Sequence, residues 1–421
     1  MRLEAASEGR HRASAFGLLS RAARALNYRA TACGLPLRAL AGSRLLVLVA
    51  GIAGVVTVRH QTGAARASGK IAQLGPTGSA LARGVLHQFD ASYYLAIAGH
   101  GYVAAAPNNL AFFPLYPALI RALGLVTGSE VIAGLVISSA SFALALVLLH
   151  RLSELELGRP AADATVLLVA FAPLSFFFSA IYTESLFLLL SVAAVLAARR
   201  ERWALAGVLA GLATLTRPTG ILLMLPIVIM RLRVRRRLDR QLAWPLIPVG
   251  VLLAYMAILA ANGFAWLAPF KAEAFWHHVT VGPVTGLASA VVLAAKSATA
   301  IVWNGKPVFA STLGGPFSAD AECVLLLLVL AIASVFLVSC FRRLPLQYGA
   351  YAGSVLLMCL SSPIIGQPLV SLDRYVLTIF PLWMAAGAWI AKRRLERVAV
   401  VVGSILLAFY TFYFTRGSFI A

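Results

Sequence analysis

The chain has 421 residues, of which 61% are hydrophobic and only 12% are charged. A soluble globular domain carries roughly 25% charged residues, so this composition excludes a water-soluble fold and predicts an all-α polytopic membrane protein. The formal net charge is +21. The arginines lie in short clusters between apolar runs, where they act as topology signals or attract anionic lipid headgroups. We therefore expect the lipid bilayer as a partner and no nucleic acid.

The first 38 residues are rich in arginine and poor in acids. This composition resembles a transit peptide or the start of a signal, but the simpler interpretation is a cytoplasmic tail before an uncleaved first span. High Ala, Arg, Gly and Leu contents fit a bacterium with a GC-rich genome, and we expect the protein in the bacterial plasma membrane. Cys33, Cys323, Cys340 and Cys359 show no spacing that indicates metal ligation or a disulfide framework.

Apolar runs of about 20 residues are long enough to cross the hydrocarbon core. Runs with charged ends predict about eleven spans, near 39–58, 130–150, 163–181, 185–198, 203–216, 219–230, 243–261, 323–341, 347–366, 374–391 and 398–415. Two long segments connect spans, 59–129 and 262–322. The second contains a semi-apolar run, 286–303, whose internal Lys296 and many small residues favour a partly buried or interfacial helix over a further span.

The basic loops agree with this topology. They all fall on one side of the membrane, which the positive-inside rule makes cytoplasmic: 151–159, 199–202, 231–240, 342–346 and 392–397. These loops all fall on one side only if residues 286–303 do not cross the membrane. The other charged groups then lie at extracytoplasmic ends of spans, and charges near membrane depth tend to mark function. This places Asp90, Glu184, Arg217 and Arg374 on one face.

Within 59–129, the stretch from His87 to Pro117 contains one acid, Asp90, among many aromatic residues. A partly desolvated carboxylate is suited to act as general base toward a sugar hydroxyl, and aromatic rings suit the apolar faces of sugars. Two other interpretations stay open: the aromatics anchor an interfacial helix, or Asp90 is a helix N-cap. The expected substrate-binding set is Phe89, Tyr93, Tyr94, His100, Tyr102, Phe113, Tyr116, Tyr182 and Glu184.

Arg217 and Arg374 are candidates for binding a phosphate, because the guanidinium group matches phosphate with two hydrogen bonds and stays charged. Arg217 is alternatively a snorkelling residue at a span end. Arg374 alternatively pairs with Asp373 or Glu184. Three roles are open for Glu184: it orients an acceptor, it pairs with an arginine, or it caps the N-terminus of the fourth span.

No cofactor is predicted from these residues. His87 and His100 together with Asp90 leave a divalent metal open, but their spacing is not diagnostic. No glycine-rich phosphate loop or Ser-His-Asp order is visible. Nucleotide sugars are absent outside the cytoplasm, so a transferase there needs a donor held in the membrane. A lipid-phosphate sugar meets that need, with its phosphate on arginine.

Five pieces resemble the PIG-V-type mannosyltransferases, polytopic glycosyltransferases of the GT-C class. They are FDASYYLAIAGHGY (89–102), AFFPLYP (111–117), YTESLF (182–187), LTRPTGIL (215–222) and DRYVLTIFPLW (373–383). The family usually has Trp-Asp at the first piece and Arg-Ser-Asn-Gly at the fourth, where this chain has Phe89-Asp90 and Arg217-Pro218-Thr219-Gly220. The resemblance implies a GT-C-like domain over 39–421, a polyprenyl-phosphate mannose donor, inverting transfer and a catalytic role for Asp90.

The sequence thus favours a membrane mannosyltransferase that acts on a glycolipid, polymer or protein at the outer membrane face. The rival hypothesis is a carrier or flippase for a lipid-linked sugar. A carrier predicts charges at mid-membrane and broken helices in two related halves, whereas here no internal repeat is visible and the charges lie at span ends.

Overall fold

The computed structural model describes residues 34–57, 89–234, 239–309, 316–418 and 420. These residues form helices joined by short connections and isolated bridges, with no β-strand among them. The all-α polytopic class is therefore confirmed. Residues 1–33 of the predicted tail, His87 and Cys33 lie outside the described part of the chain.

The bundle is built around α5 (Glu130–Leu157), α6 (Arg159–Ala170), α7 (Glu184–Arg199) and α8 (Trp203–Thr214). Helix α5 packs on both α6 and α7, and α7 packs on α8. The 28 residues of α5 span about 42 Å at 1.5 Å per residue. Gly158 closes α5 with a φ of 82°, and Pro160 lies in the first turn of the next helix, where its missing N–H is not needed.

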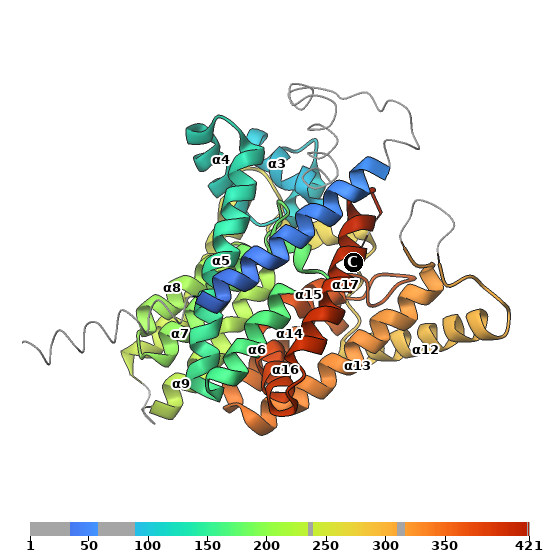
Figure 1. The fold of residues 1–421 in the computed structure, drawn as a ribbon. Helices are drawn as coiled ribbons and strands as arrows, with labels where there is room; N and C mark the ends of the chain where they lie inside the picture. The colour runs from blue at the N-terminus through green and yellow to red at the C-terminus, as the bar shows by residue number, and fades with distance from the viewer. Residues whose placement is uncertain (1–33, 58–88, 235–238, 310–315, 419, 421) are drawn as a thin grey trace, which may run out of the picture.

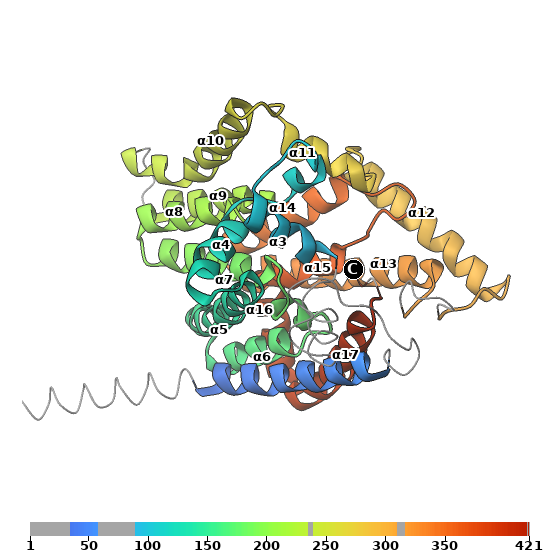
Figure 2. The ribbon, with the colours of Figure 1, turned by 90° about the horizontal axis from the view of Figure 1, so that it is seen from above.

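The second half of the chain completes the bundle. Its helices are α9 (Met224–Val234), α10 (Ile247–Ala261), α11 (Ala268–Ala272), α12 (Pro283–Val302), α13 (Ala319–Arg343), α14 (Leu346–Ser361), α15 (Leu372–Thr378), α16 (Phe380–Arg393) and α17 (Glu396–Thr415). Helix α16 packs on α6, and α14 packs on α9. The first described helix, Gly34–Thr57, lies beside α17 (Figures 1 and 2), where Gly54 approaches the Phe412 carbonyl and Thr415.

The basic loops lie together on one face of the bundle. Arg199 Nε donates to Glu156 Oε1 at 2.6 Å, and the Tyr348 hydroxyl donates to the same oxygen at 3.1 Å. Nearby, Arg233 Nη1 donates to Gln347 Oε1 at 3.2 Å. The ends of α5, α7, α9 and α14 therefore meet on one side, as the positive-inside assignment requires.

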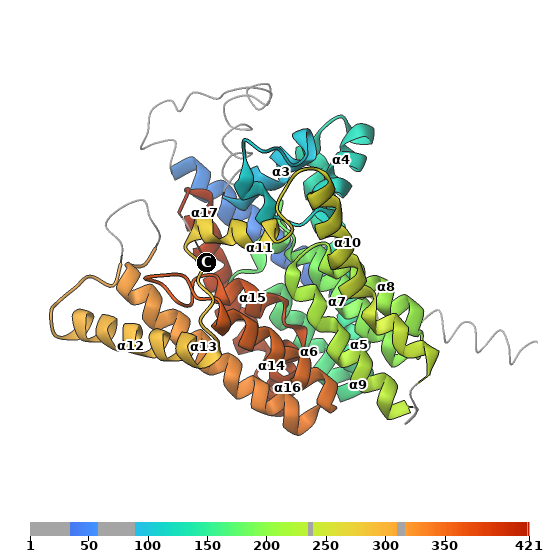
Figure 3. The same ribbon diagram turned by 180° about the vertical axis from the view of Figure 1, so that it is seen from behind.

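The opposite face, called the outer face from here on, carries the two short helices of the first long connection. These are α3 (Asp90–His100) and α4 (Leu115–Thr127), which lie at the end of the bundle away from the tips of α9 and α16 (Figures 1 and 3). Helix α11 joins them on this face through its contacts with the 3₁₀ turn Pro107–Ala111. The described part of the first long connection, 89–129, is therefore a folded cap over the bundle.

Several predicted spans differ from the helices. Among the described residues, six helices are long and apolar enough to cross a membrane, and the bent pair α15–α16 would make a seventh. The span predicted at 163–181 is wrong in its second half, because α6 ends at Ala170 before Pro173. The span predicted at 347–366 ends at Ser361, two residues before Pro363. The span predicted at 374–391 is bent by 74° between α15 and α16, where Pro381 opens α16.

Helix α12 covers the run predicted as 286–303 and meets the length and hydropathy of a span. It lies at one side of the bundle, where it packs on α13 and α14 (Figures 1 and 3). Near its start, Gly286 approaches the carbonyl of Leu360, at the outer end of α14. Just beyond its end, Lys306 pairs with Asp320, at the outer end of α13, at 2.9 Å. The two ends of α12 therefore lie near the outer ends of α14 and α13, and an interfacial position for this helix stays a prediction.

Cysteine labelling tests this arrangement. In a background with the native cysteines replaced by serine, we expect a membrane-impermeant maleimide to label Asn304→Cys and His100→Cys in sealed right-side-out vesicles. Both positions are exposed and lie on the outer face. The exposed Arg200→Cys should react only after lysis. Protection of Asn304→Cys before lysis would show that α12 crosses the bilayer.

Candidate active site

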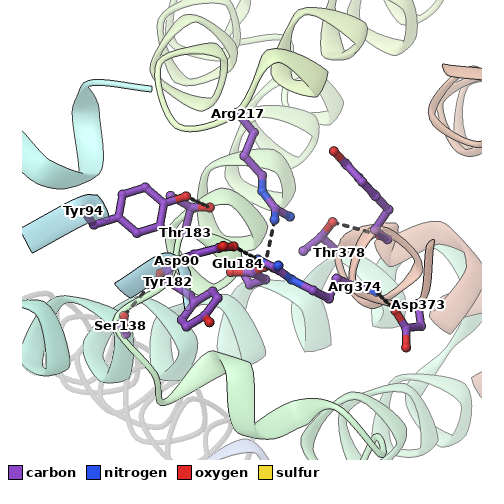
Figure 4. A network of polar contacts seen from close by, with 11 residues as sticks. Asp90, Tyr94, Ser138, Tyr182, Thr183, Glu184, Arg217, Asp373, Arg374 and Thr378 are labelled. Atoms are coloured by element: carbon purple, nitrogen blue, oxygen red, sulfur yellow. Dashed lines mark hydrogen bonds and ion pairs between the residues drawn. The ribbon is translucent and has the colours of Figure 1, made fainter. Parts of the chain in front are cut away.

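Four charged side chains from distant parts of the chain converge at the outer face (Figure 4). Arg374 Nη2 lies 2.8 Å from Asp90 Oδ2 and 2.8 Å from Glu184 Oε1. Arg217 Nη2 lies 2.8 Å from the same glutamate oxygen. We call this group the charged quartet. Two carboxylates balance two guanidinium groups, so its formal charge is zero.

The members of the charged quartet differ in burial. The Glu184 side chain is fully buried, those of Arg374 and Arg217 are 10% and 13% exposed, and that of Asp90 is 23% exposed. A buried carboxylate is costly unless it is paired, and Glu184 is paired with both arginines. It is the fixed centre of the group, while Asp90 is the carboxylate that a ligand can reach.

Aromatic rings hold the two arginines in place. The Arg374 guanidinium lies 4.9 Å from the ring centre of Phe177 and 5.0 Å from that of Tyr182. The Arg217 guanidinium lies 5.4 Å from the ring of Tyr375. Such contacts are worth about 2 kcal/mol when desolvated. Arg217 thus pairs with Glu184 instead of snorkelling, and Arg374 pairs with Glu184 and Asp90. Phosphate binding stays a prediction for both arginines.

The local chain path explains how the acids reach this position. Asp90 is the first residue of α3, whose N-cap is Phe89, and Glu184 is likewise the first residue of α7. The N-cap interpretation of Asp90 is therefore wrong. Phe89 and Ser371, just before α3 and α15, have φ values of 52° and 64°. Each such conformation costs of order 1–3 kcal/mol, and such strain often lies at functional sites.

Arg44 supports the segment that carries Glu184. Its Nη1 donates to the Ser175 carbonyl at 2.8 Å and to Ser179 Oγ at 2.7 Å, and its Nη2 donates to Ser175 Oγ at 2.6 Å. These bonds satisfy polar groups of the irregular connection 171–183 inside the bundle. Arg44 was not among the predicted site residues, although a charge within the predicted first span was a usable signal.

The predicted aromatic residues mostly pack against each other. Tyr93 stacks on Phe112 with ring centres 4.6 Å apart, and Tyr94 meets the edge of Tyr116 at 5.2 Å. The Tyr94 hydroxyl lies 3.3 Å from Thr183 Oγ1, beside Glu184. Tyr94, Phe113, Tyr116 and Tyr182 are at most 5% exposed. They fix α3 against the bundle, and direct contact with a substrate stays a prediction for them.

Other predicted residues lie away from the quartet. His100 ends α3 and is exposed, about 15 Å along the helix axis from Asp90. The Tyr102 hydroxyl donates to the Phe112 carbonyl at 2.6 Å. Phe89 packs against Phe414 at 6.0 Å. No group of three potential metal ligands occurs in the described ranges, and His87 falls outside them.

Comparison with known proteins identifies the segment that contains most of this site. Residues 66–235 match the family model described as Mannosyltransferase (PIG-V). The resemblance to the PIG-V mannosyltransferases is confirmed for this segment. The PIG-V segment includes Asp90, Glu184 and Arg217, whereas Arg374 comes from the chain beyond it. The site is therefore completed by a helix outside the matched region.

Curated relatives match over the same part of the chain. GPI alpha-1,6-mannosyltransferase 2 of Cricetulus griseus is 34% identical over 154 residues, 33% of this chain and 30% of the relative. The Homo sapiens protein of that name is 35% identical over 154 residues, with the same shares. GPI mannosyltransferase 2 of Yarrowia lipolytica is 37% identical over 109 residues, 25% of this chain and 30% of the relative. The chain thus matches about a third of their length. These relatives are eukaryotic, so a bacterial plasma membrane stays a prediction.

Solved structures give weaker likenesses. ArnT from Cupriavidus metallidurans in the apo state is 14% identical with a TM-score of 0.44, covering 77% of this chain and 71% of ArnT. The apo Archaeoglobus fulgidus oligosaccharyltransferase is 15% identical with a TM-score of 0.41, covering 89% of this chain and 55% of that one. With TM-scores this low, these structures do not establish the fold, and a GT-C-like fold stays a prediction.

Replacing the central acid tests how far the charged quartet stabilises the fold. Glu184→Gln leaves two buried guanidinium groups without their shared counter-charge, a loss of about 3–5 kcal/mol for a buried pair. We expect a clear fall in Tm of the detergent-solubilised protein, measured by thermal unfolding. Glu396→Gln, in the first turn of α17 on the opposite face, is the control and should leave Tm nearly unchanged. Equal Tm values would show that Glu184 is not a structural centre.

Proposed function

We propose that this chain is a membrane glycosyltransferase that moves mannose from a polyprenyl-phosphate donor to an acceptor hydroxyl at the outer face. The acceptor is a glycolipid, a polymer or a protein. One observation carries the proposal: a reachable acid, Asp90, lies 2.8 Å from an arginine that is bound to a second arginine through buried Glu184. The match of residues 66–235 to the PIG-V family supports the choice of mannose.

Asp90 is the group we assign as general base. It is the most exposed carboxylate of the charged quartet, and one of its oxygens, Oδ2, is engaged by Arg374. A general base must come within hydrogen-bond reach of the proton that it removes. Glu184 is unsuited to this role, because its side chain has no exposed surface.

Arg217 is the group that we assign to the donor phosphate. Its Nη2 is bound to Glu184, but its buried Nη1 has no hydrogen-bond partner among the described residues. A buried N–H without a partner is costly, so an incoming phosphate oxygen would be bound favourably there. Guanidinium groups aimed at a departing phosphate stabilise the charge that develops on it.

The charges of the quartet suit such a transfer. The acceptor oxygen gives its proton to Asp90 and forms a bond to the anomeric carbon, while the bond from that carbon to the phosphate oxygen breaks and its electron pair leaves with the lipid phosphate. The phosphate gains one negative charge as Asp90 loses one. The quartet then has a net charge of +1, because Arg374 loses Asp90 as a charged partner and keeps only Glu184. This positive charge offsets the charge that develops on the phosphate.

The carrier hypothesis has one observation in its favour, the 74° bend between α15 and α16. A carrier built from two related halves would show a matching break in the other half. In the described residues only this one pair is bent in this way. Transfer of label from donor to acceptor, as opposed to movement of intact donor across the bilayer, separates the two hypotheses.

Asp90→Asn is the decisive substitution. We expect it to lower transfer of radiolabelled mannose from polyprenyl-phosphate mannose to membrane acceptors by at least about 100-fold, as for loss of a general base. The matched control is Asp320→Asn, an aspartate of similar exposure that pairs with Lys306, and it should retain transfer. Equal transfer by wild type and Asp90→Asn would remove Asp90 from the mechanism.

Arg217→Gln tests the phosphate assignment separately. Loss of one charge-stabilising donor typically costs about 10²–10³ in kcat, and we expect a loss of that size together with a higher KM for the donor. Arg233→Gln, on the opposite face beside Gln347, should behave as wild type. A variant whose kcat and donor KM are both unchanged would show that Arg217 does not meet the phosphate.

A further inference from the structure

Part of the second long connection lies over the site. We call residues 268–281 the cover segment. Val279 N donates to the Pro363 carbonyl at 3.0 Å, and Val281 N donates to the Ser361 carbonyl at 3.1 Å, so the end of the segment pairs with the chain after α14. In the middle of the segment, the Trp276 ring lies 5.7 Å from that of Tyr93. The cover segment is therefore attached both to the bundle and to α3.

A cavity of about 190 Å³ lies beneath the cover segment. Its walls come from the cover segment, the turn after Arg217, the end of α14 and the chain around α15. The lining includes Thr219, Phe270, Glu273, His278, Ser362 and Tyr375. The ring of Tyr375 also contacts Arg217, a member of the charged quartet, at 5.4 Å. The cavity, called the Glu273 cavity from here on, thus adjoins the proposed phosphate site.

Two polar groups in the Glu273 cavity have unused hydrogen-bonding capacity. Thr219 is 2% exposed, and its Oγ1 has no hydrogen-bond partner among the described residues. The Glu273 carboxylate lies 3.6 Å from His278 Nε2, beyond hydrogen-bond length. His278 Nδ1 lies 2.9 Å from the Ser362 carbonyl, to which it donates. A buried hydroxyl without a partner is uncommon in native structures and calls for an explanation such as a ligand.

The charges around Glu273 bear on what the cavity accepts. Burial raises the pKa of Glu273, the neighbouring His278 opposes this shift, the negative charge of Asp90 adds to it, and the positive charge of Arg217 opposes it. No lysine or arginine lines the cavity, so it is poorly suited to a phosphate or another anion. A carboxyl group and an unpartnered hydroxyl between Phe270 and Tyr375 suit a ligand with several hydroxyls and an apolar face.

We propose that the Glu273 cavity binds one uncharged sugar unit, with Glu273 and Thr219 taking its hydroxyl groups and the aromatic rings taking its apolar face. This inference rests on the proposed glycosyl transfer, and the sugar is either that of the donor or the terminal one of the acceptor. The volume is below the roughly 300–1,000 Å³ of drug-sized pockets. It suits a single pyranose ring and excludes a polyprenyl chain.

Direct binding tests the cavity without requiring catalysis. Methyl α-D-mannopyranoside is titrated into the purified full-length protein in detergent, and its Kd is measured by calorimetry. We expect Glu273→Gln and the nearly isosteric Thr219→Val each to raise Kd by about tenfold, as loss of a hydrogen bond to a buried group would. The controls Glu396→Gln and Thr127→Val should bind as wild type. No binding to wild type, or equal binding by all five proteins, would overturn the inference.

Inhibition of mannose transfer by the same glycoside identifies the source of the sugar. Inhibition that is competitive with polyprenyl-phosphate mannose assigns the cavity to the donor sugar. Labelled disaccharide formed on the glycoside, or inhibition that is not competitive with the donor, assigns it to the acceptor. Either effect should weaken in Glu273→Gln, and an effect that does not weaken counts against the cavity.

The binding and transfer experiments fail independently. Asp90→Asn should lose transfer and still bind the glycoside, because Asp90 does not line the cavity. If Asp90→Asn transfers normally while Glu273→Gln loses binding, the proposed role of Asp90 is wrong and the sugar site stands. If Asp90→Asn is inactive and Glu273→Gln binds normally, the sugar site alone is wrong. Tm values of all variants show whether they are folded.

Discussion

The fully buried carboxylate of Glu184 is the constraint on which the site depends. One of its oxygens, Oε1, is bound by both Arg217 and Arg374. Because a lone carboxylate at this depth would be strongly unfavourable, the fold must bring both guanidinium groups to it. Those guanidinium groups belong to the turn after α8 and to α15, so one acid fixes the relative positions of three elements. Asp90 is then held at the edge of this arrangement by Arg374.

This arrangement goes together with two interruptions of regular helix within the bundle. Residues 171–183 are not α-helical, and α15 and α16 meet at a 74° bend. Irregular backbone at membrane depth is tolerated only where protein satisfies its polar groups, and Arg44 does this for 171–183. The break in α15–α16 turns Arg374 toward the acids. The two interruptions thus lie beside the charged residues Glu184 and Arg374.

The outer cap has a different role from the one that its composition suggested. The aromatic residues of the first long connection were expected to meet a sugar, yet three of them, Tyr94, Phe113 and Tyr116, are nearly fully buried. Their packing holds Asp90 at the start of α3 and attaches the cover segment through Trp276. In the sugar site that we propose, the hydroxyl-binding groups come from the second long connection and from the turn at Thr219.

The sequence by itself determined the all-helical membrane class, the side on which the basic loops lie, and the common face of Asp90, Glu184, Arg217 and Arg374. Apolar length and charge patterning act locally, so these features can be read without knowing the contacts. Tertiary structure decided which acid is buried, which arginine nitrogen is left without a partner, and where helices break. Glu273 and Thr219 carried no local signal, because a cavity is formed only when segments distant in the chain pack together. The free energy of burying each charge depends on which distant residues pack around it, and residue periodicity carries no information about those contacts.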